Sequence, residues 1–516
     1  MSKRILSLVL AMLLVILALP ASFAEGEKKE LTVAVKVSRF DMGDNFADKP
    51  FVKILEERTG VHVNWVEIPE AAYNEKMATL LAGDLPDVFV LGMSDELVRD
   101  NAGLFVPIQD LIEENCPNLL KKYDETMDGW WSYLTYPDGN IYSLMSWYGE
   151  NEINSCGGLP QINTEWLARV GKEMPTTAEE LYDVLVAFKE QDANGNGDPN
   201  DEIPMDFSNA YGYSHILNMA SMWGLPIINT VLYSVEGDEV KPVVNTQAYR
   251  EFLEYFSKLR AEGLLNIEGF SQSYEQLTAN LKAGIVGFVP HFSVYSVLEG
   301  DIPKAYTHVV PLAAEGYEMS LYREKAISAR RNGFVITTAC EDPELALQWW
   351  EAWSEDDLAL LTARFEEGCW WYYAEDGYTR IGKDATKEEV AAYGYDLDVI
   401  GGIGTLMYGN YHPFVHQNHI GDISDPYSYN GSRILAVRAA KPYYSGVMTQ
   451  QIVDTEDAEE LAFATDGLSN YIMAYLADSI LHGVTDESWD AYVAGLEDYG
   501  HSFMIEWYNR KLNCEI

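Results

Sequence analysis

Residues 31–91 alternate between apolar runs and amphipathic segments, and this alternation constrains the fold more than any other feature. Three runs rich in β-branched residues favour strands: 31–37, 61–68 and 87–91. Two segments with apolar residues at helical spacing lie between them: 49–59 and 71–81. Strands and helices in this order, joined by short links, form right-handed crossovers and a parallel sheet. The sequence therefore predicts an α/β fold, in which ligands bind beyond the carboxyl ends of the strands.

The rest of the chain continues this mixed pattern. A length of 516 residues suggests two or three domains, at roughly 100–200 residues each. Thr177 and Glu180 have the spacing of a capping box at the start of a helix over 177–190. Further strands are expected at 141–145, 285–289 and 331–338. From residue 343 onward the pattern is mostly helical.

The first 24 residues have the organisation of a secretory signal peptide. Lys3 and Arg4 precede an apolar run over 5–19, and Ser22 and Ala24 place small residues before a cut at Glu25. The run is shorter than the roughly 20 residues of a membrane span, so an uncleaved anchor is the less favoured alternative. No cysteine lies near the cut, which excludes lipid attachment there. We expect a secreted, extracytoplasmic protein associated with the cell surface.

The charge balance limits the partners. The chain has 35 Lys and Arg against 81 Asp and Glu, a formal net charge of −46, which repels nucleic-acid phosphates. Nucleic acid is therefore not an expected partner. The 33 Tyr and 13 Trp outnumber the 18 Phe, and Tyr and Trp combine an apolar ring face with a polar tip. Most of these rings belong in cores, but such rings also stack on sugars.

The segment 192–202 carries oxygen side chains at the spacing of a calcium loop. Asp192, Asn194 and Asn196 occupy alternate positions, and Gly197 allows a sharp turn. This resembles the first half of an EF-hand loop. Position 12 of that pattern is Ile203, so an acidic residue just before it must complete the coordination. The predicted structural Ca²⁺ ligands are Asp192, Asn194, Asn196, Asp198, Asp201 and Glu202. The alternative is a polar surface turn without metal.

Catalytic signatures are absent from the sequence. It contains no Gly-x-Ser-x-Gly, no His-Glu-x-x-His and no phosphate-binding glycine-rich loop. Carboxylate pairs occur, but 81 acidic residues produce such pairs by chance, so they are weak support for glycoside hydrolysis. We expect a binding protein without catalytic residues rather than an enzyme.

Several motifs together resemble one family. The blocks include 162–167 (INTEWL), 175–177 (PTT), 187–190 (AFKE), the calcium-type loop ending at 201–204 (DEIP), 83–87 (GDLPD) and 137–142 (PDGNIY). They are similar to those of the extracellular solute-binding proteins of family 1, which serve ABC importers of oligosaccharides. The resemblance extends over nearly all of the chain after residue 24, and the calcium-loop block is its most specific part.

The resemblance implies a two-lobed periplasmic-binding-protein-like fold with a hinge and a ligand cleft between the lobes. We expect lobe 1 to comprise 25–137 and 285–342, and lobe 2 to comprise 138–284 and 343–516. Lobe 2 would then carry the calcium loop, whose six ligands are those given above. The family also implies a hinge motion that closes the lobes on the ligand.

Polar and aromatic side chains near predicted strand ends are the candidates for ligand contact. Rings would stack on pyranose faces, while Arg, Asp and Asn would bond hydroxyls. The candidates are Arg39, Asp41, Asp95, Trp147, Tyr148, Tyr211, Tyr213, Trp223, His291, Asn332, Trp370 and Trp371. Core packing is the alternative for each ring.

The favoured hypothesis is a monomeric receptor that captures an oligosaccharide and delivers it to the permease subunits of an ABC importer. A receptor for peptides or other small solutes is the first alternative. A secreted calcium-dependent glycoside hydrolase or lyase is the second, which turnover of a glycan would reveal. A sensor or adhesion component that presents its ligand to a membrane partner is the third.

Overall fold

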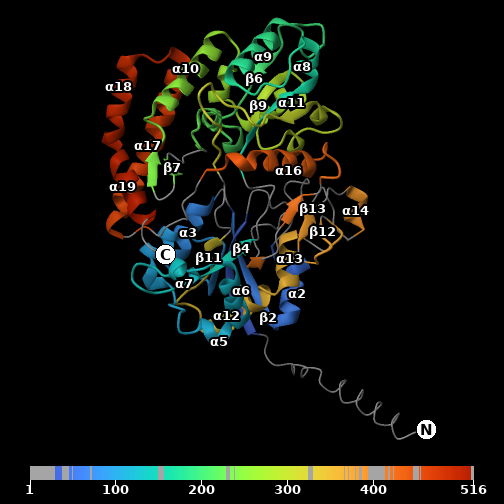
Figure 1. Ribbon diagram of the computed structural model, residues 1–516. Coiled ribbons are helices and arrows are strands. Elements are labelled where there is room, and N and C mark those ends of the chain that lie inside the picture. The colour runs from blue at the N-terminus through green and yellow to red at the C-terminus, as the bar shows by residue number, and fades with distance from the viewer. Residues whose placement is uncertain are drawn as a thin grey trace, which may run out of the picture.

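The computed structural model describes residues 29–37, 46–48, 50–69, 72–148, 156–227, 233–236, 239–322, 329–364, 367–369, 371–377, 379–382, 386–392, 413–415, 419–421, 423–445, 453 and 455–512. Within them the elements gather into two groups, one above the other in Figure 1. Each group has its own sheet and its own hydrophobic core. We call the lower group lobe 1 and the upper group lobe 2.

Lobe 1 is built on a sheet in which six described strands run in the order β14-β4-β11-β3-β1-β2. Their bounds are β1 Lys29–Val37, β2 Val61–Pro69, β3 Val88–Val90, β4 Ser143–Tyr148, β11 Ala329–Ile336 and β14 Phe414–Val415. β1 pairs in parallel with both β2 and β3, which confirms the parallel arrangement expected for 31–91. β11 pairs antiparallel with β3 and β4, so the sheet as a whole is mixed.

Helices cover this sheet on both faces. Around it lie α2 Pro50–Thr59, α3 Tyr73–Ala82, α4 Asp95–Asp100, α5 Ile112–Asn115, α6 Pro117–Thr126, α7 Trp130–Leu134, α12 Pro343–Trp353 and α13 Asp356–Arg364. Trp349, Trp350 and Trp353 of α12 are buried in the same core as Val33 of β1. Burial of such large apolar side chains, at roughly 25 cal/mol per Å², is the main stabilising contribution to this lobe.

Lobe 2 contains a smaller sheet in which four described strands run in the order β10-β5-β9-β6. The strands are β5 Leu159–Asn163, β6 Ile203–Met205, β9 Val286–His291 and β10 Tyr306–His308. Its helices are α8 Thr164–Val170, α9 Ala178–Glu190, α10 Gln247–Ala261, α11 Tyr274–Lys282, α16 Tyr429–Ala440, α17 Thr455–His482, α18 Asp486–Gly495 and α19 His501–Leu512. The expected capping box is present, with Glu180 N–H donating to the Thr177 hydroxyl at 3.1 Å.

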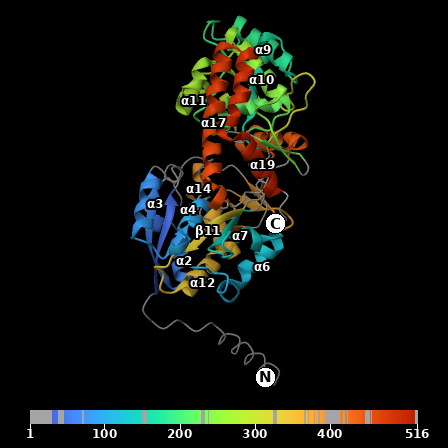
Figure 2. The ribbon, with the colours of Figure 1, turned by 90° about the vertical axis from the view of Figure 1, so that its left-hand side faces the viewer.

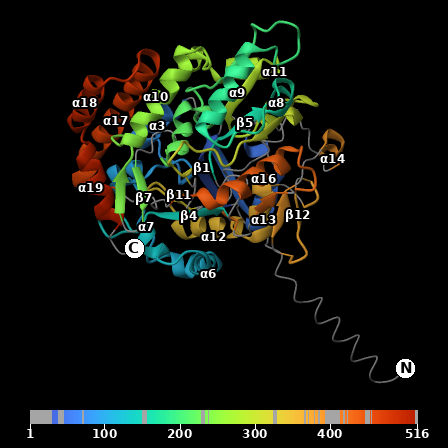
Figure 3. The same ribbon diagram turned by 45° about the horizontal axis from the view of Figure 1, so that its top comes forward.

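The C-terminal helices extend the core of lobe 2. Leu468, Ile472 and Leu476 of α17 are buried with Phe252 and Phe256 of α10. Figure 3 shows α17, α18 and α19 on one side of this lobe and α8, α9 and α11 on the other, with α10 between them. In Figure 2, α17 runs along the lobe and toward lobe 1. Arg99 of α4 donates a hydrogen bond to the Val453 carbonyl at 3.1 Å, so Val453, two residues before α17, lies beside lobe 1.

Smaller elements complete the described chain. β7 Tyr233–Glu236 and β8 Glu239–Pro242 form a hairpin. A separate sheet joins β12 Trp371–Tyr373, β13 Arg380–Gly382 and β15 His419–Gly421, and α14 spans Lys387–Ala391. In the described residues, no helix is both long enough and apolar enough to cross a membrane. The proposed signal peptide, 1–24, lies outside them.

The packing corrects the expected division of the chain at three places. β4 lies beyond the expected boundary at 138 but pairs with β11 in the sheet of lobe 1. β9 lies beyond the boundary at 285 but pairs with β5 in lobe 2. α12 was expected in lobe 2 and packs in the core of lobe 1. An apolar run indicates a strand or helix, but its partner is set by contacts distant in sequence, which local periodicity does not encode.

Candidate functional site

Two of the candidate ligand residues meet at the carboxyl end of β3. Asp95 begins α4, four residues after the expected strand 87–91, and Ser94 caps that helix by accepting from Leu97 N–H at 3.2 Å. Asn332 lies on β11, where the register shifts between Arg330 and Phe334. Asn332 Nδ2 donates to Asp95 Oδ1 at 2.8 Å. The structure therefore brings together a carboxylate and an amide from distant parts of the chain.

The same carboxylate is paired with a buried cation. Arg331 Nη1 donates to Asp95 Oδ2, and the Arg331 and Asp95 side chains are 3% and 9% exposed. Arg331 Nε donates to the Tyr133 carbonyl at 2.7 Å, and its guanidinium lies 4.2 Å from the centre of the Tyr133 ring. Tyr136 donates its hydroxyl hydrogen to Asn332 Oδ1 at 2.9 Å. These contacts hold the cluster in one arrangement.

Burial sets the electrostatics of this cluster. Desolvation raises the pKa of Asp95, and the Arg331 guanidinium and the Asn332 amide oppose that shift. Desolvation also raises the pKa of Tyr136. The Tyr136 hydroxyl therefore stays protonated and acts as a donor. The cluster fixes the shape of the sheet edge, and a ligand would meet side chains that already bond one another.

A second group of candidates stacks in lobe 2. The Tyr211 and Tyr274 rings lie 4.1 Å apart with an angle of 25° between their planes, and Tyr274 stacks in turn on His291 at 5.8 Å. Ser293 N–H donates to His291 Nδ1 at 3.2 Å, and Nε2 lies 3.0 Å from the Tyr274 hydroxyl. Burial lowers the pKa of His291 to about 4. His291 is therefore neutral at physiological pH, and it supports the tyrosine pair.

Two of the candidate rings lie in cores. Trp223 is 4% exposed and packs against Phe252, Tyr255 and Phe256. Trp371, 4% exposed, lies edge-on to Tyr373. This burial corresponds to the core-packing alternative for both. The half-buried Trp147 stacks on Phe414 at 6.1 Å.

Some candidates lie outside what the structure describes. Arg39, Asp41 and Trp370 fall outside the described residues, as do the side chains of Tyr148 and Tyr213. Their predicted roles stay predictions.

Four residues with notable contacts were not among the candidates: Tyr136, Asn218, Tyr274 and Arg331. Arg331 is adjacent to Asn332 within a run expected to be a buried strand, and a cation in such a run needs a partner. That requirement could have indicated from the sequence that Arg331 has a buried partner. Asn218 sits in an apolar stretch, where a lone amide gives a similar hint. Nothing local distinguished Tyr136 or Tyr274 from the other tyrosines.

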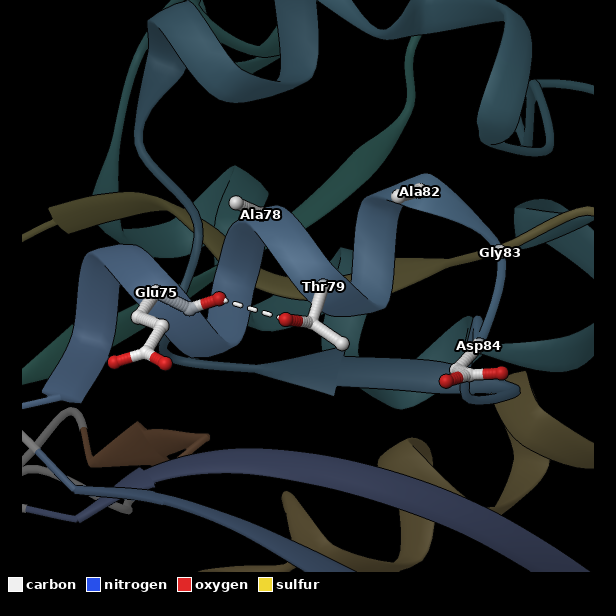
Figure 4. A pocket seen from close by; sticks show the side chains of 6 residues that line it. All are labelled: Glu75, Ala78, Thr79, Ala82, Gly83 and Asp84. Carbon is white, nitrogen blue, oxygen red and sulfur yellow. Dashed lines mark hydrogen bonds between the residues drawn. The ribbon is translucent and has the colours of Figure 1, made fainter.

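A surface hollow on lobe 1 does not have the features of a ligand site. It has a volume of about 660 Å³ and follows the exposed side of α3, lined by Glu75, Ala78, Thr79, Ala82, Gly83 and Asp84. Figure 4 shows the two acidic side chains at opposite ends of this surface, and the Thr79 hydroxyl donates to the Glu75 carbonyl at 3.0 Å. The hollow is open, and the described residues of its lining include no aromatic ring, unlike a typical ligand pocket.

The loop 192–202 is held by hydrogen bonds among the predicted calcium ligands. Asn194 Nδ2 and Asn196 Nδ2 donate to the two carboxylate oxygens of Asp201 at 2.8 and 2.7 Å. Gly197 N–H donates to Asp192 Oδ2 at 3.0 Å. Among the described residues no three His, Cys, Asp or Glu side chains converge as a metal site. The two Asn side chains instead occupy positions next to the Asp201 oxygens.

Two oxygens in this loop nevertheless suit a cation. Within the described part of the chain, Asp192 Oδ1 and Glu202 Oε2 are buried and accept no hydrogen bond. A buried carboxylate oxygen without a donor is unfavourable unless a cation neutralises it. Carboxylate and amide oxygens are also the ligands that Ca²⁺ prefers. The residues therefore fit Ca²⁺, provided that Asn194 and Asn196 rotate their amides.

The sequence matches the family model described as bacterial extracellular solute-binding protein over residues 44–353. The chain belongs to this family. The family is one of binding proteins, and its description as extracellular places this solute-binding protein outside the cytoplasm.

Relatives agree with this assignment. The fructooligosaccharide ABC transporter substrate-binding protein FusA of Streptococcus pneumoniae is 26% identical over 510 residues, covering 93% of this solute-binding protein and 89% of FusA. The solved structure of FusA in complex with kestose superposes with a TM-score of 0.75, at 24% identity over 94% of this chain and 99% of that one. The structure of an HMO-binding solute-binding protein from Bifidobacterium longum infantis superposes with a TM-score of 0.72. The identity is 22%, over 95% of this chain and 99% of that one. These likenesses confirm the two-lobed α/β fold class.

Proposed function

We propose that the protein is the receptor of an ABC importer, which captures an oligosaccharide between its two lobes and delivers it to a permease. The observation that carries this proposal is the likeness to FusA along nearly the whole of both chains. A partial match would transfer only a domain, whereas a match over 93% of this chain includes residues of both lobes.

The arrangement of the lobes supports the same proposal. The last strand of lobe 1 before the crossing ends at Tyr148, and the first strand of lobe 2 begins at Leu159. The chain is back in the sheet of lobe 1 at Ala329. Connections of this kind allow a hinge motion between rigid bodies. The Asp95–Asn332 cluster lies at the carboxyl end of β3, where ligands bind in α/β sheets. The Tyr211–Tyr274 stack supplies ring faces in lobe 2, of the kind on which sugars pack.

Calcium is part of the proposal. One solved FusA structure is described as an EF-hand mutant, so that relative has an EF-hand. In this chain Asp192, Asn194, Asn196, Asp198, Asp201 and Glu202 would hold the ion. Bound Ca²⁺ would neutralise the buried oxygens of Asp192 and Glu202 and fix the loop between α9 and β6. Its role is structural.

Export and assembly complete the proposal. Residues 1–24 act as a cleaved signal peptide, and the mature protein stays at the cell surface as a monomer. Its partners are the transmembrane subunits of the permease. The acidic surface, at a net charge of −46, favours cationic patches on that partner.

A thermal-shift panel tests the proposed function. Residues 25–516 are heated in the presence of Ca²⁺ with kestose, maltotriose, cellotriose, xylotriose, trigalacturonate or tripeptides. A ligand that binds the folded state raises the melting temperature. At a hundred times its Kd, it adds about 2.7 kcal/mol to the free energy of unfolding. A shift with one class of oligosaccharide supports the proposal. A shift with peptides alone contradicts it.

A further inference from the structure

A small hollow lies where the chain passes between the lobes. Its volume is about 20 Å³, and its lining includes Gly157, Gly158, Asn218, Ser221, Leu321 and Tyr322. Gly157 and Gly158 open lobe 2 after the passage from β4, and Leu321 and Tyr322 end it before the passage to β11. The hollow therefore adjoins two of the connections between the lobes.

The lining is firmly held. Arg433 of α16 donates through Nη2 to the Gly157 carbonyl at 2.8 Å. Leu321 N–H donates to the Tyr443 carbonyl at 2.7 Å, and Ser445 N–H donates to the Leu321 carbonyl at 2.9 Å. α16 thus bonds the first connection and the residues just after α16 bond the second, and α16 borders lobe 1 in Figure 1. A group that enters this hollow meets a fixed surface next to the expected hinge.

Asn218 is a polar side chain of this lining whose acceptor oxygen receives no hydrogen bond from the described residues. The residue is 8% exposed, and its Nδ2 donates to the Gly212 carbonyl at 2.9 Å. That bond fixes the orientation of the amide, because a carbonyl needs a donor. Asn218 Oδ1 is buried and accepts no hydrogen bond from any residue that the structure describes. An unsatisfied buried acceptor is unfavourable, so this oxygen favours an incoming donor.

The size and charge of the hollow limit that donor. A volume of about 20 Å³ holds one water-sized group, which matches a single hydroxyl and is too small for an acetamido or carboxylate group. Among the described residues that line the hollow, none is a Lys or Arg that could balance an anion. We propose that Asn218 accepts a hydrogen bond from a hydroxyl of the bound sugar and thereby favours neutral oligosaccharides over polyuronates. This inference rests on the proposed function and adds the chemical class of the ligand.

The variant Asn218→Leu tests the inference, because leucine keeps the volume and removes the acceptor. Its matched control is Asn115→Leu in lobe 1. Asn115 is 7% exposed, and both its groups are paired within the fold, Nδ2 with the Leu111 carbonyl and Oδ1 with Gln348 Nε2. Both variants lose a buried amide, and only the first loses the proposed contact with the sugar.

The thermal-shift panel selects the neutral trisaccharide with the largest effect among kestose, maltotriose, cellotriose and xylotriose. Calorimetry then measures the Kd of that sugar and of trigalacturonate. We expect the wild type to bind the neutral sugar at least tenfold more tightly than trigalacturonate. We expect Asn218→Leu to weaken that binding roughly tenfold, as loss of one buried hydrogen bond predicts. Asn115→Leu should leave the Kd unchanged.

Two results would overturn the inference while leaving the receptor proposal intact: tighter binding of trigalacturonate by the wild type, or an unchanged Kd in Asn218→Leu. If Asn218→Leu does not fold, the comparison of the two sugars on the wild type still decides. Absence of binding by every sugar would remove the proposed function, and the inference with it.

Discussion

Asn332 donates a hydrogen bond of 2.8 Å to Asp95 across 237 residues of sequence, and both side chains are buried. This bond, with the Arg331 ion pair, links the end of β3 to the irregular part of β11. The sheet edge of lobe 1 is therefore organised before any ligand arrives, which reduces the ordering that binding requires.

Replacing Asp95 by Asn should destabilise the protein strongly. Asparagine keeps the shape but leaves the Arg331 guanidinium buried without its charge partner, which costs about 3–5 kcal/mol. Chemical denaturation measures the loss. Asp357→Asn is the control, since Asp357 pairs with Arg58 on the surface, where its side chain is 67% exposed. There we expect at most about 1 kcal/mol. Equal losses in the two variants would contradict the account.

Replacing Gly333 by Ala should distort the edge that carries Asn332. A Cβ at Gly333 would lie 2.5 Å from the Ser146 backbone nitrogen, so β11 or β4 must move. We expect a loss of about 1–3 kcal/mol in the free energy of unfolding. Gly103→Ala is the control, because a Cβ there meets nothing within 4 Å. A Gly333→Ala variant as stable as the wild type would show that the two strands are not tightly packed there.

Acid should weaken the protein partly through His291. Burial lowers the pKa of His291 to about 4 from an ordinary value of 6.5, so the unfolded chain binds a proton that the folded chain does not. This contribution to stability is complete above pH 6.5 and is lost as pH falls toward 4, by about 3 kcal/mol. His291→Gln should show a correspondingly smaller loss between those pH values.

The control for acid unfolding is His482→Gln, because the His482 side chain is 70% exposed. Its pH dependence should match that of the wild type. Many carboxylates also titrate in this range, so the difference between each variant and the wild type is the relevant quantity. A pH dependence unchanged by His291→Gln would contradict the burial argument.

Calcium should raise the melting temperature through the loop 192–202. The double variant Asp192→Asn, Glu202→Gln removes the charges of the two buried oxygens that lack donors, and we expect it to abolish the difference between Ca²⁺ and EDTA. Asn200→Ala is the control, since Asn200 is exposed and outside the predicted ligands. If the wild type has the same melting temperature in Ca²⁺ and in EDTA, the loop is a polar turn stabilised by its own hydrogen bonds.

The sequence predicted local structure more accurately than long-range contacts. The strands and helices of 31–91 and the Thr177 capping box formed as expected, because their signals lie within a few residues. β4, β9 and α12 pack in the other lobe from the one expected for their residues, because packing depends on residues far along the chain. Trp223 illustrates the same limit, since the sequence does not distinguish an aromatic ring in a core from one at a ligand site. Asp95 and Asn332 were both chosen as polar residues near strand ends, but their mutual bond required the fold.

Calorimetric titration of residues 25–516 with the oligosaccharide that gives the largest thermal shift, followed by chromatography of the sugar afterward, tests the central claim most directly. The account predicts one binding site per chain and full recovery of the intact sugar. Recovery of a shortened sugar would contradict it and identify an enzyme.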